Sequence, residues 1–256
     1  MMKSYVITPA AGKRLIARAV ARHPAVEQAL QGNRVVIVAG TTNGCVAEEI
    51  LRNLGRDGEF DRRRFFRGIT LPPKRPTSKQ GRLPDESGFP GDVVIVKGEW
   101  QPGKTIFDVV EDLEEGDVIV KGANALDLSR KRAGILIAHP RGGTIGVGLQ
   151  AVIGRRVRLL VPVGLEKRVN VDLDRIAALL NAPGTQGPRF CPVPGEVITE
   201  LEAVSLLTGA RAELVAGGGV SGAEGSVWLC VSGDGEQEEM VRELLEGILG
   251  EPPFVL

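Results

Sequence analysis

VVIVAGTTNGCVAEEIL, residues 35–51, is the stretch that decides the fold. Its aliphatic run predicts a buried strand, its glycine-flanked polar centre a turn, and its last residues a helix. Ligands of open α/β sheets bind beyond the carboxyl ends of the strands. A helix that begins there offers unpaired N–H groups and a partial positive charge, which suit a phosphate or a carboxylate. The stretch therefore predicts an anion-binding turn, and a helix cap that binds nothing is the alternative.

The composition is typical of a soluble globular protein, with 43% hydrophobic and 25% charged residues among 256. The net charge is zero, so no overall attraction to nucleic acid or to a membrane surface is expected. No apolar run reaches the roughly 18 residues of a membrane span, and the first residues carry no apolar signal region. The three separated cysteines fit a reducing compartment. We therefore expect a cytoplasmic protein without a membrane partner.

Five continuous aliphatic runs predict buried strands. Runs of this kind, without alternation of polar residues, are typical of a parallel sheet that is covered on both faces. They span residues Arg34–Ala39, Asp92–Val96, Asp117–Val120, Gly134–Ala138 and Val157–Val163. Helical spacing follows most of them, at Val46–Leu54, Thr105–Leu113, Thr144–Ile153 and Leu173–Leu180. This alternation predicts an open, mainly parallel, Rossmann-like α/β sheet.

The chain is expected to form two lobes. Residues 1–188 would be an α/β ligand-binding domain, interrupted at residues 71–91 by an irregular loop that holds five prolines. Long irregular loops in compact domains are often functional lids, and a surface insertion is the alternative. Residues 189–256 would be a small α+β lobe. Its elements are expected at Glu196–Leu207 (helix), Arg211–Ala216 and Ser226–Val231 (strands) and Glu236–Leu249 (helix).

Charge is unevenly distributed along the chain. Residues 56–82 hold nine Lys or Arg and three Asp or Glu, whereas residues 196–256 hold two Arg and twelve Asp or Glu. Two solvated surfaces would explain this difference. The alternative is a basic flap at residues 56–82 that draws anionic ligands toward a cleft.

The residues that follow the predicted strands are small, polar or cationic. Because the carboxyl ends of parallel strands meet at one edge of a sheet, we expect these residues to form one ligand-binding rim. The candidate binding residues are Gly40, Thr41, Thr42, Asn43 and Gly44 after the first strand, Lys97 and Gly98 after the second, Lys121, Gly122 and Asn124 after the third, and Arg141, Gly142, Gly143 and Thr144 after the fourth.

Lys121 is the strongest candidate for an anion clamp or an acid/base group, because partial burial lowers the pKa of a lysine. A strand-end lysine that reaches solvent is the alternative. The Gly40–Gly44 turn is not a P-loop, which needs a Gly-Lys-Ser/Thr ending, and it lacks the Gly-x-Gly-x-x-Gly pattern of dinucleotide sites. We therefore expect no cofactor. With two histidines and no paired cysteines, no metal-ligand spacing is present either.

Three segments together carry a resemblance to a known family. They are GTTNG at residues 40–44, IVKGANAL at residues 119–126 and VPGEVI at residues 193–198. In this order, after an N-terminal helix and a strand, they resemble the NagB/RpiA/CoA-transferase-like superfamily and look most like type A ribose-5-phosphate isomerase. The resemblance implies that the Gly40–Gly44 turn and Lys121 border a sugar-phosphate pocket.

The chain departs from the isomerase pattern around the lysine. The Asp-Gly-Ala-Asp loop that precedes the family's lysine is missing. The family's glutamate base should follow soon after, but this chain has Asp127 and then Ser129-Arg130-Lys131. Since aldose–ketose isomerisation needs a carboxylate base at the carbon-bound proton, Asp127 is the nearby candidate, on a different spacing. The sequence therefore retains the motifs of the family's pocket but lacks the isomerase's full set of catalytic residues.

The leading hypothesis is a protein that binds a small phosphorylated or carboxylated metabolite, with isomerase-like activity if Lys121 and Asp127 act as acid and base. A metabolite sensor without catalysis is one alternative. An acyl or CoA transferase is another, with Glu99 as its nucleophile. Superfamily regulators carry a DNA-binding module before the fold; only about 33 residues precede the first strand here, so direct DNA binding is not expected. A homo-oligomer is expected on general grounds.

Overall fold

A computed structural model describes residues 2–68, 70–71, 75–78 and 81–255. Its central sheet has the strand order β10-β8-β5-β2-β3-β4. The bounds are β2 (Arg34–Ile37), β3 (Val93–Val96), β4 (Glu99–Trp100), β5 (Val118–Val120), β8 (Arg158–Pro162) and β10 (Glu196–Ile198). Strands β10, β8, β5 and β2 run parallel, whereas β3 and β4 run antiparallel to their neighbours. The mixed α/β class with a mostly parallel sheet is confirmed.

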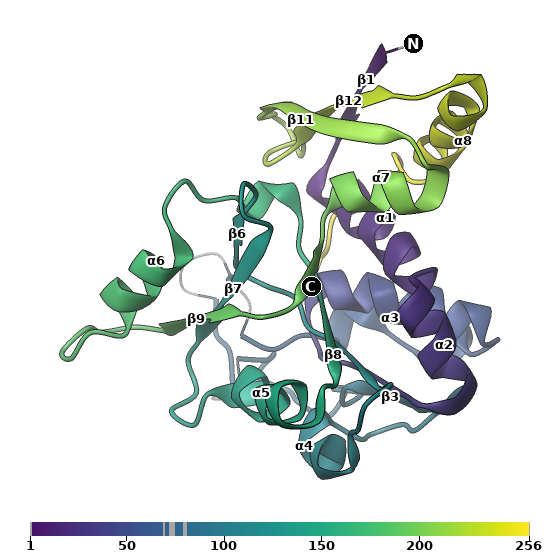
Figure 1. Ribbon diagram of the computed structural model, residues 1–256. Coiled ribbons are helices and arrows are strands. Elements are labelled where there is room, and N and C mark those ends of the chain that lie inside the picture. Colours follow the sequence, from purple (N-terminus) through teal and green to yellow (C-terminus); the bar gives the residue numbers. More distant parts are fainter. Residues whose placement is uncertain (1, 69, 72–74, 79–80, 256) are drawn as a thin grey trace.

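Helices cover both faces of this sheet, which explains why its strands are aliphatic throughout (Figure 1). On one side lie α1 (Pro9–Ala21), α2 (Pro24–Gly32) and α3 (Thr41–Asn53), and on the other α4 (Ile106–Val109) and α5 (Gly143–Arg155). A glycine allows α5 to pack closely against α4, because a Cβ at Gly148 would lie 3.3 Å from the Ile106 side chain. Within the described ranges, no helix is long and apolar enough to cross a bilayer.

The direction of β3 differs from the prediction. Arg34 pairs with Val96 and Ile37 with Val93, so β3 ends where β2 begins. The prediction that Lys97 and Gly98 join the ligand-binding rim is therefore wrong: the backbone N–H of Lys97 donates to the Asn33 carbonyl at 2.8 Å, at the opposite end of the sheet. The described part of the connection from α3 to β3 holds only two short 3₁₀ turns, η1 (Asp57–Glu59) and η2 (Arg62–Arg64). Helix α3 already carries the chain back to the end of the sheet where β2 begins, so a parallel strand could start there. The loop instead returns to the other end, where Val93 lies opposite Ile37, and β3 therefore runs antiparallel.

A second, antiparallel sheet has the order β6-β7-β9, with β6 (Ala125–Asp127), β7 (Arg132–Ile137) and β9 (Arg189–Val193). The prediction that residues 134–138 belong to the parallel sheet is wrong, because β7 returns directly from β6 as a hairpin. Helix α6 (Leu173–Leu180) packs against β9. The Asn181 side chain fixes the start of β9, with bonds of 2.9 and 2.8 Å to the N–H and carbonyl of Phe190.

A third sheet joins the two ends of the chain. Its order is β1-β12-β11, with β1 (Met2–Ile7), β11 (Arg211–Gly217) and β12 (Val227–Ser232), next to α7 (Glu200–Thr208) and α8 (Gly235–Glu246). Figure 1 shows this sheet at the top, with α8 beside it. The helix predicted from residue 196 instead begins at Glu200, after β10 and the Thr199 cap. The boundary expected between residues 188 and 189 therefore does not separate the sheets. Strand β1, before it, pairs with β12, and β10, after it, completes the central sheet.

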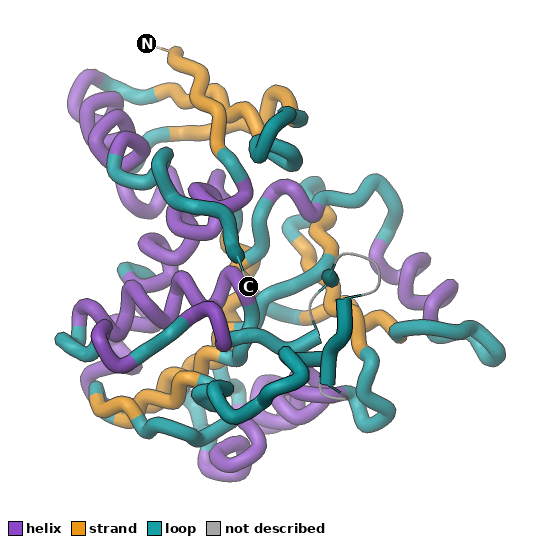
Figure 2. The backbone as a smooth tube through the Cα atoms, turned by 180° about the vertical axis from the view of Figure 1, so that it is seen from behind, coloured by secondary structure: helices purple, strands orange, loops and turns teal. Residues whose placement is uncertain are grey.

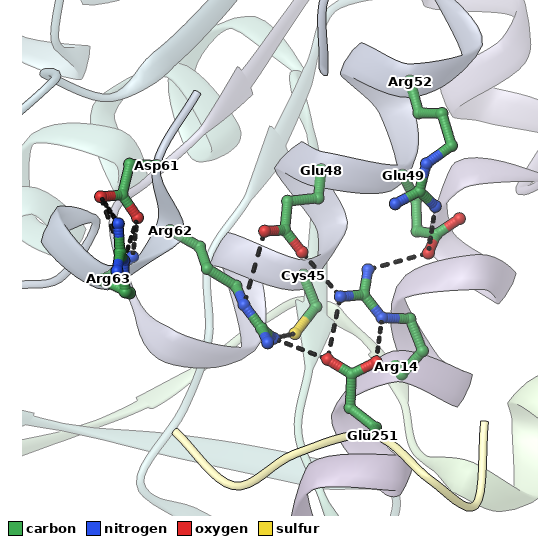
Figure 3. Close-up of polar contacts among 9 residues, drawn as sticks. All are labelled: Arg14, Cys45, Glu48, Glu49, Arg52, Asp61, Arg62, Arg63 and Glu251. Carbon is green, nitrogen blue, oxygen red and sulfur yellow. Dashed lines mark hydrogen bonds and ion pairs between the residues drawn. The ribbon is translucent and has the colours of Figure 1, made fainter. Parts of the chain in front are cut away.

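A buried ion-pair cluster ties the C-terminal segment to α1 and α3 (Figure 3). Arg14 pairs with Glu48 at 2.6 Å, Glu49 at 2.8 Å and Glu251 at 2.9 Å, and its side chain is 8% exposed. Arg62 pairs with Glu251 at 2.9 Å. Burial works against the charge of Arg14, but the bonds to Glu251 and Glu48 outweigh it and hold the pKa of Arg14 above its ordinary value. Figure 2 shows the C-terminal segment running back to the middle of the molecule.

Candidate functional site

A cavity of about 1280 Å³ opens where the carboxyl ends of three parallel strands meet. Residues 40–43 line it after β2, residues 121–124 after β5, and Lys167 after β8. This position agrees with the general location of ligand sites in open α/β sheets. The loop after β7 also reaches the cavity, with His139, Pro140 and residues 142–144, although β7 belongs to another sheet.

Helix α3 points its N-terminus at this cavity without a side-chain cap. Its N-cap residue is Gly40, and no side chain bonds the first turn. Among the described helices of eight or more residues, α1, α2, α6, α7 and α8 each have an N-cap side chain that accepts a first-turn N–H. The first N–H groups of a helix need a partner. Those of α3 are therefore available to a ligand in the cavity.

Two buried oxygens in the first turn of α3 have no hydrogen-bond partner among the residues that the structure describes: Thr42 Oγ1 and Asn43 Oδ1. Their residues are 3% and 1% exposed, and both line the cavity. The amide nitrogen of Asn43 donates to the carbonyls of Val38 at 2.7 Å and Val120 at 3.0 Å, which fixes the direction of Oδ1. Buried polar atoms in native proteins nearly always have a partner. A ligand that accepts from Thr42 and donates to Asn43 would supply both.

Helix α5 supplies a second N-terminus without a side-chain cap. Its N-cap residue Gly142 has φ 80° and Gly143 has φ 59°, a left-handed backbone that favours glycine. Gly142, Gly143 and Thr144 line the cavity as predicted. Arg141 is exposed and is not among the lining residues; its backbone N–H donates to His139 Nδ1 at 3.2 Å. The structure therefore does not place the Arg141 side chain in the site.

The charged side chains around the cavity are all cationic. Six of them line it, and no described lining residue is Asp or Glu. The six are Lys13, Arg67, Arg75, Arg82, Lys121 and Lys167. A cleft lined by charge of one sign concentrates ligands of the opposite sign. Three of these arginines come from the basic stretch at residues 56–82, so part of that stretch does face the cavity.

Asp92 holds three segments of the cavity wall together through hydrogen bonds. Its carboxylate is fully buried and accepts from the N–H of Ala39 at 2.9 Å, from the N–H of Ile106 at 2.8 Å and from Arg67 Nη1 at 2.8 Å. The guanidinium groups of Arg67 and Arg82 lie 4.8 and 4.2 Å from the centre of the Phe89 ring. Asp92 precedes β3, so the antiparallel direction of that strand places a carboxylate at the rim where a lysine was predicted.

Lys121 follows β5 and is half-buried at the cavity wall. Burial lowers its pKa to about 8; the nearby Asp92 carboxylate works in the opposite direction, and the charges of Lys167 and Arg67 lower the pKa further. Among the described residues, Lys121 makes no ion pair within 4.0 Å, and its Nζ donates only to the Gly122 carbonyl, at 3.5 Å. Lys121 is thus a cavity lysine that has no direct counter-ion in the described part of the chain.

A buried carboxyl group lies behind Lys167. Glu200 is 2% exposed and accepts from the N–H of Leu165 at 2.9 Å. Burial, and then the charge of Glu166, raise the pKa of Glu200 to about 8. Lys167 Nζ donates to the Ala123 carbonyl at 2.8 Å, and burial lowers the pKa of this lysine also. Burial thus works against the charged form of each group.

Stability should fall with rising pH because of Glu200. Its pKa is 4.5 in the unfolded chain and about 8 in the fold, so the folded state binds more protons between these values and loses stability as the pH rises through that window. Glu200→Gln keeps an acceptor for Leu165 and should flatten the decline. Urea unfolding at pH 5, 6, 7 and 8 measures the effect. If the free energy of unfolding fell equally steeply with pH in the wild type and in Glu200→Gln, the raised pKa of Glu200 would be contradicted.

Two further candidates have structural roles away from the cavity. Gly44 lies inside α3, where a Cβ would come within 3.1 Å of Arg62 Cβ, so this glycine allows the η2 turn to pack on the helix. Asp127 ends β6, and its Oδ1 accepts from Ser129 Oγ at 2.6 Å and from the N–H of Arg130 at 3.1 Å. Asp127 does not line the cavity. The structure therefore separates the two predicted catalytic residues, Lys121 and Asp127.

Several cavity residues were missed by sequence reasoning. Lys167 follows β8, and the strand-end rule applied to that strand would have found it. Lys13 lies inside α1, and no local pattern marks it as different from other helical lysines. Asn124 was predicted and does line the cavity, but its Oδ1 accepts from the N–H of Leu136 at 3.0 Å and so holds β7 in place.

The described residues contain no group of three or more His, Cys, Asp or Glu side chains arranged to hold a metal ion. Comparison of the chain with protein-family models, with curated proteins and with solved structures finds no match. The function is therefore inferred from the cavity itself.

Proposed function

We propose that the cavity binds a small phosphorylated metabolite of the sugar-phosphate type, with its phosphate at the N-terminus of α3. One observation carries the proposal: Thr42 Oγ1 and Asn43 Oδ1 are buried without partners in the first turn of an uncapped helix. A phosphate accepts from the free N–H groups and from the threonine hydroxyl. A sugar hydroxyl donates a hydrogen bond to Asn43 Oδ1. A phosphate ion alone offers mainly acceptor oxygens and is a poorer partner for this atom.

The cationic lining supports a ligand of high negative charge. Lys13 of α1, Lys167 after β8 and Arg67 of the loop before β3 all line the cavity, so three separate segments of the chain bring positive charge to the ligand. Charge-assisted hydrogen bonds of this kind are shorter and stronger than neutral ones. A small carboxylate carries less charge and fewer acceptor oxygens, and it is the weaker ligand in this proposal.

The same features support a Rossmann-like fold of the NagB/RpiA/CoA-transferase-like kind, with the Gly40–Gly44 turn and Lys121 at its pocket. They favour binding over isomerase chemistry, because no described lining residue is a carboxylate that could serve as base. An acyl transferase with Glu99 is disfavoured: β4 holds Glu99 in an exposed position, after the end of β3 that points away from the cavity.

Calorimetric titration with ribose 5-phosphate, glucose 6-phosphate, inorganic phosphate and citrate tests the proposal. Thr42→Val removes a hydroxyl that has no partner, so it should leave the stability of the free protein unchanged or raised. It should weaken sugar-phosphate binding by about 10- to 150-fold, as expected for a hydrogen bond of about 1.5–3 kcal/mol to a charged group.

The matched control is Thr185→Val, an exposed threonine whose hydroxyl donates to the Leu179 carbonyl. It should not alter binding. Absence of heat with both sugar phosphates, or equal affinity of the Thr42→Val and wild-type proteins, would overturn the phosphate site. Stronger binding of citrate than of either sugar phosphate would also overturn it.

A further inference from the structure

We infer that Lys121 forms a covalent imine with the carbonyl carbon of a phosphorylated aldehyde or ketone held in the cavity. The inference rests on the proposed phosphate site and names the chemical class of the ligand. It adds an activity, reversible capture of a carbonyl compound, that binding of a phosphate alone would not require.

The position of Lys121 places its amine beside the phosphate site. The Asn43 side-chain amide donates one of its hydrogens to the Val120 carbonyl at 3.0 Å, so the residue before Lys121 is hydrogen-bonded directly to the first turn of α3. A Cβ on the next residue, Gly122, would lie 3.8 Å from Asn43 Oδ1. A ligand anchored by its phosphate at Thr42 would therefore extend past Lys121.

The environment of Lys121 favours a nucleophile over an anion clamp. The charge of a phosphate is already met by Lys13, Lys167 and Arg67, and Lys121 lacks a carboxylate partner within 4.0 Å among the described residues. Burial is the main reason why its pKa falls to about 8; Asp92 opposes the fall, while Lys167 and Arg67 add to it. At pH 8 about half of the Lys121 amines are neutral, whereas an ordinary lysine with a pKa of about 10.4 is almost fully charged. Only the neutral amine attacks a carbonyl carbon.

The chemical step balances without a co-reactant. The neutral amine adds to the carbonyl carbon, a C–N bond forms and the carbonyl π electrons move to oxygen. The two amine hydrogens pass to that oxygen, which leaves as water while the C=N bond forms. No atom changes its overall oxidation state, and hydrolysis reverses the step. Open-chain sugar phosphates and phosphorylated short aldehydes carry both the phosphate and the carbonyl that the step needs.

Reductive trapping tests the imine. The protein is incubated with glyceraldehyde 3-phosphate and sodium cyanoborohydride, and adducts are measured by intact mass and located by peptide mapping. We expect one adduct at Lys121, at least 10-fold faster than with unphosphorylated glyceraldehyde. Its rate should rise with pH through about 8 and then level. Lys97→Arg is the matched control, because Lys97 also follows a strand but is exposed at the other end of the sheet.

Lys121→Arg keeps the positive charge and should abolish the adduct, and Lys121→Met serves if the arginine variant does not fold. Lys97→Arg should react as the wild type does. A separate titration with glycerol 3-phosphate, which has a phosphate but no carbonyl, keeps the two proposals apart. Binding of glycerol 3-phosphate without a Lys121 adduct would overturn the imine and leave the phosphate site standing. An adduct spread over many lysines without preference for the phosphorylated aldehyde would also overturn the imine. Failure of both phosphorylated compounds to bind would overturn the phosphate site itself.

Discussion

Arg14→Ala is expected to lower the free energy of unfolding by about 3–5 kcal/mol, the usual cost of removing one partner from a buried ion pair. Arg14 is the shared partner of Glu48, Glu49 and Glu251, whose side chains are 22%, 12% and 13% exposed. Without the guanidinium, three mostly buried carboxylates face one another, and among the described residues only Arg62 and Arg52 are left to pair with them. Chemical denaturation at neutral pH measures the loss.

The control for Arg14 is Arg242→Ala. Arg242 also pairs with two carboxylates, Glu239 and Glu246, but on the outer face of α8 where water screens the charges. Its replacement should leave the unfolding midpoint nearly unchanged. If both substitutions had equally small effects, the cluster in Figure 3 would not be an important stabilising contact. Arg14→Ala should also release the segment that Glu251 anchors, which limited proteolysis near residues 250–255 would detect.

Asp92→Ala is expected to destabilise the fold by about 3–5 kcal/mol and to remove ligand binding as well. The substitution leaves Arg67 without its carboxylate and leaves the buried N–H groups of Ala39 and Ile106 without an acceptor. Ala39 precedes the Gly40 turn, so the first turn of α3 would lose its fixed position. Denaturation measures the first effect, and titration with ribose 5-phosphate measures the second.

Asp117→Ala separates these two effects. Asp117 is equally buried and also accepts backbone N–H bonds, from Arg34 at 2.7 Å and Glu114 at 2.9 Å, but it precedes β5 at the end of the sheet away from the cavity. We expect a comparable loss of stability with binding retained, measured at a temperature where both variants are folded. Loss of binding in both variants would show that Asp92 acts only through stability.

The elements with strong local patterns were predicted well from the sequence. The run at residues 34–39 and the helical spacing after it correspond to β2 and α3, and Leu173–Leu180 is the helix α6. The Gly40–Asn43 turn and Lys121 were also correctly placed at the wall of one cavity. The position of the turn follows from a strand, a turn and a helix that are adjacent in the chain. Lys121 lies at the same wall because β5 pairs in parallel with β2, as the strand-end rule expects.

What the sequence did not reveal depends on contacts between distant segments. DVVIV at residues 92–96 has the same aliphatic pattern in either direction, and only the path of the preceding loop makes β3 antiparallel. Lys97 was therefore placed at the wrong end and Asp92 was overlooked. The Arg14–Glu251 pair spans 237 residues, and neither residue has a neighbour in sequence that predicts it. Lys13 reaches the cavity only because α1 packs against α3.

The pairing of β1 with β12 has a consequence for biosynthesis. Met2 lies opposite Ser232, so β1 cannot pair with β12 until 230 further residues have been made. At 5–20 residues per second this delay is roughly 10–50 s. During that time the edge of β1 is open to the β12 of another nascent or newly released chain. High expression levels should therefore yield a fraction of dimers with exchanged β1 strands, and a lower expression level, with fewer chains present at once, should reduce that fraction.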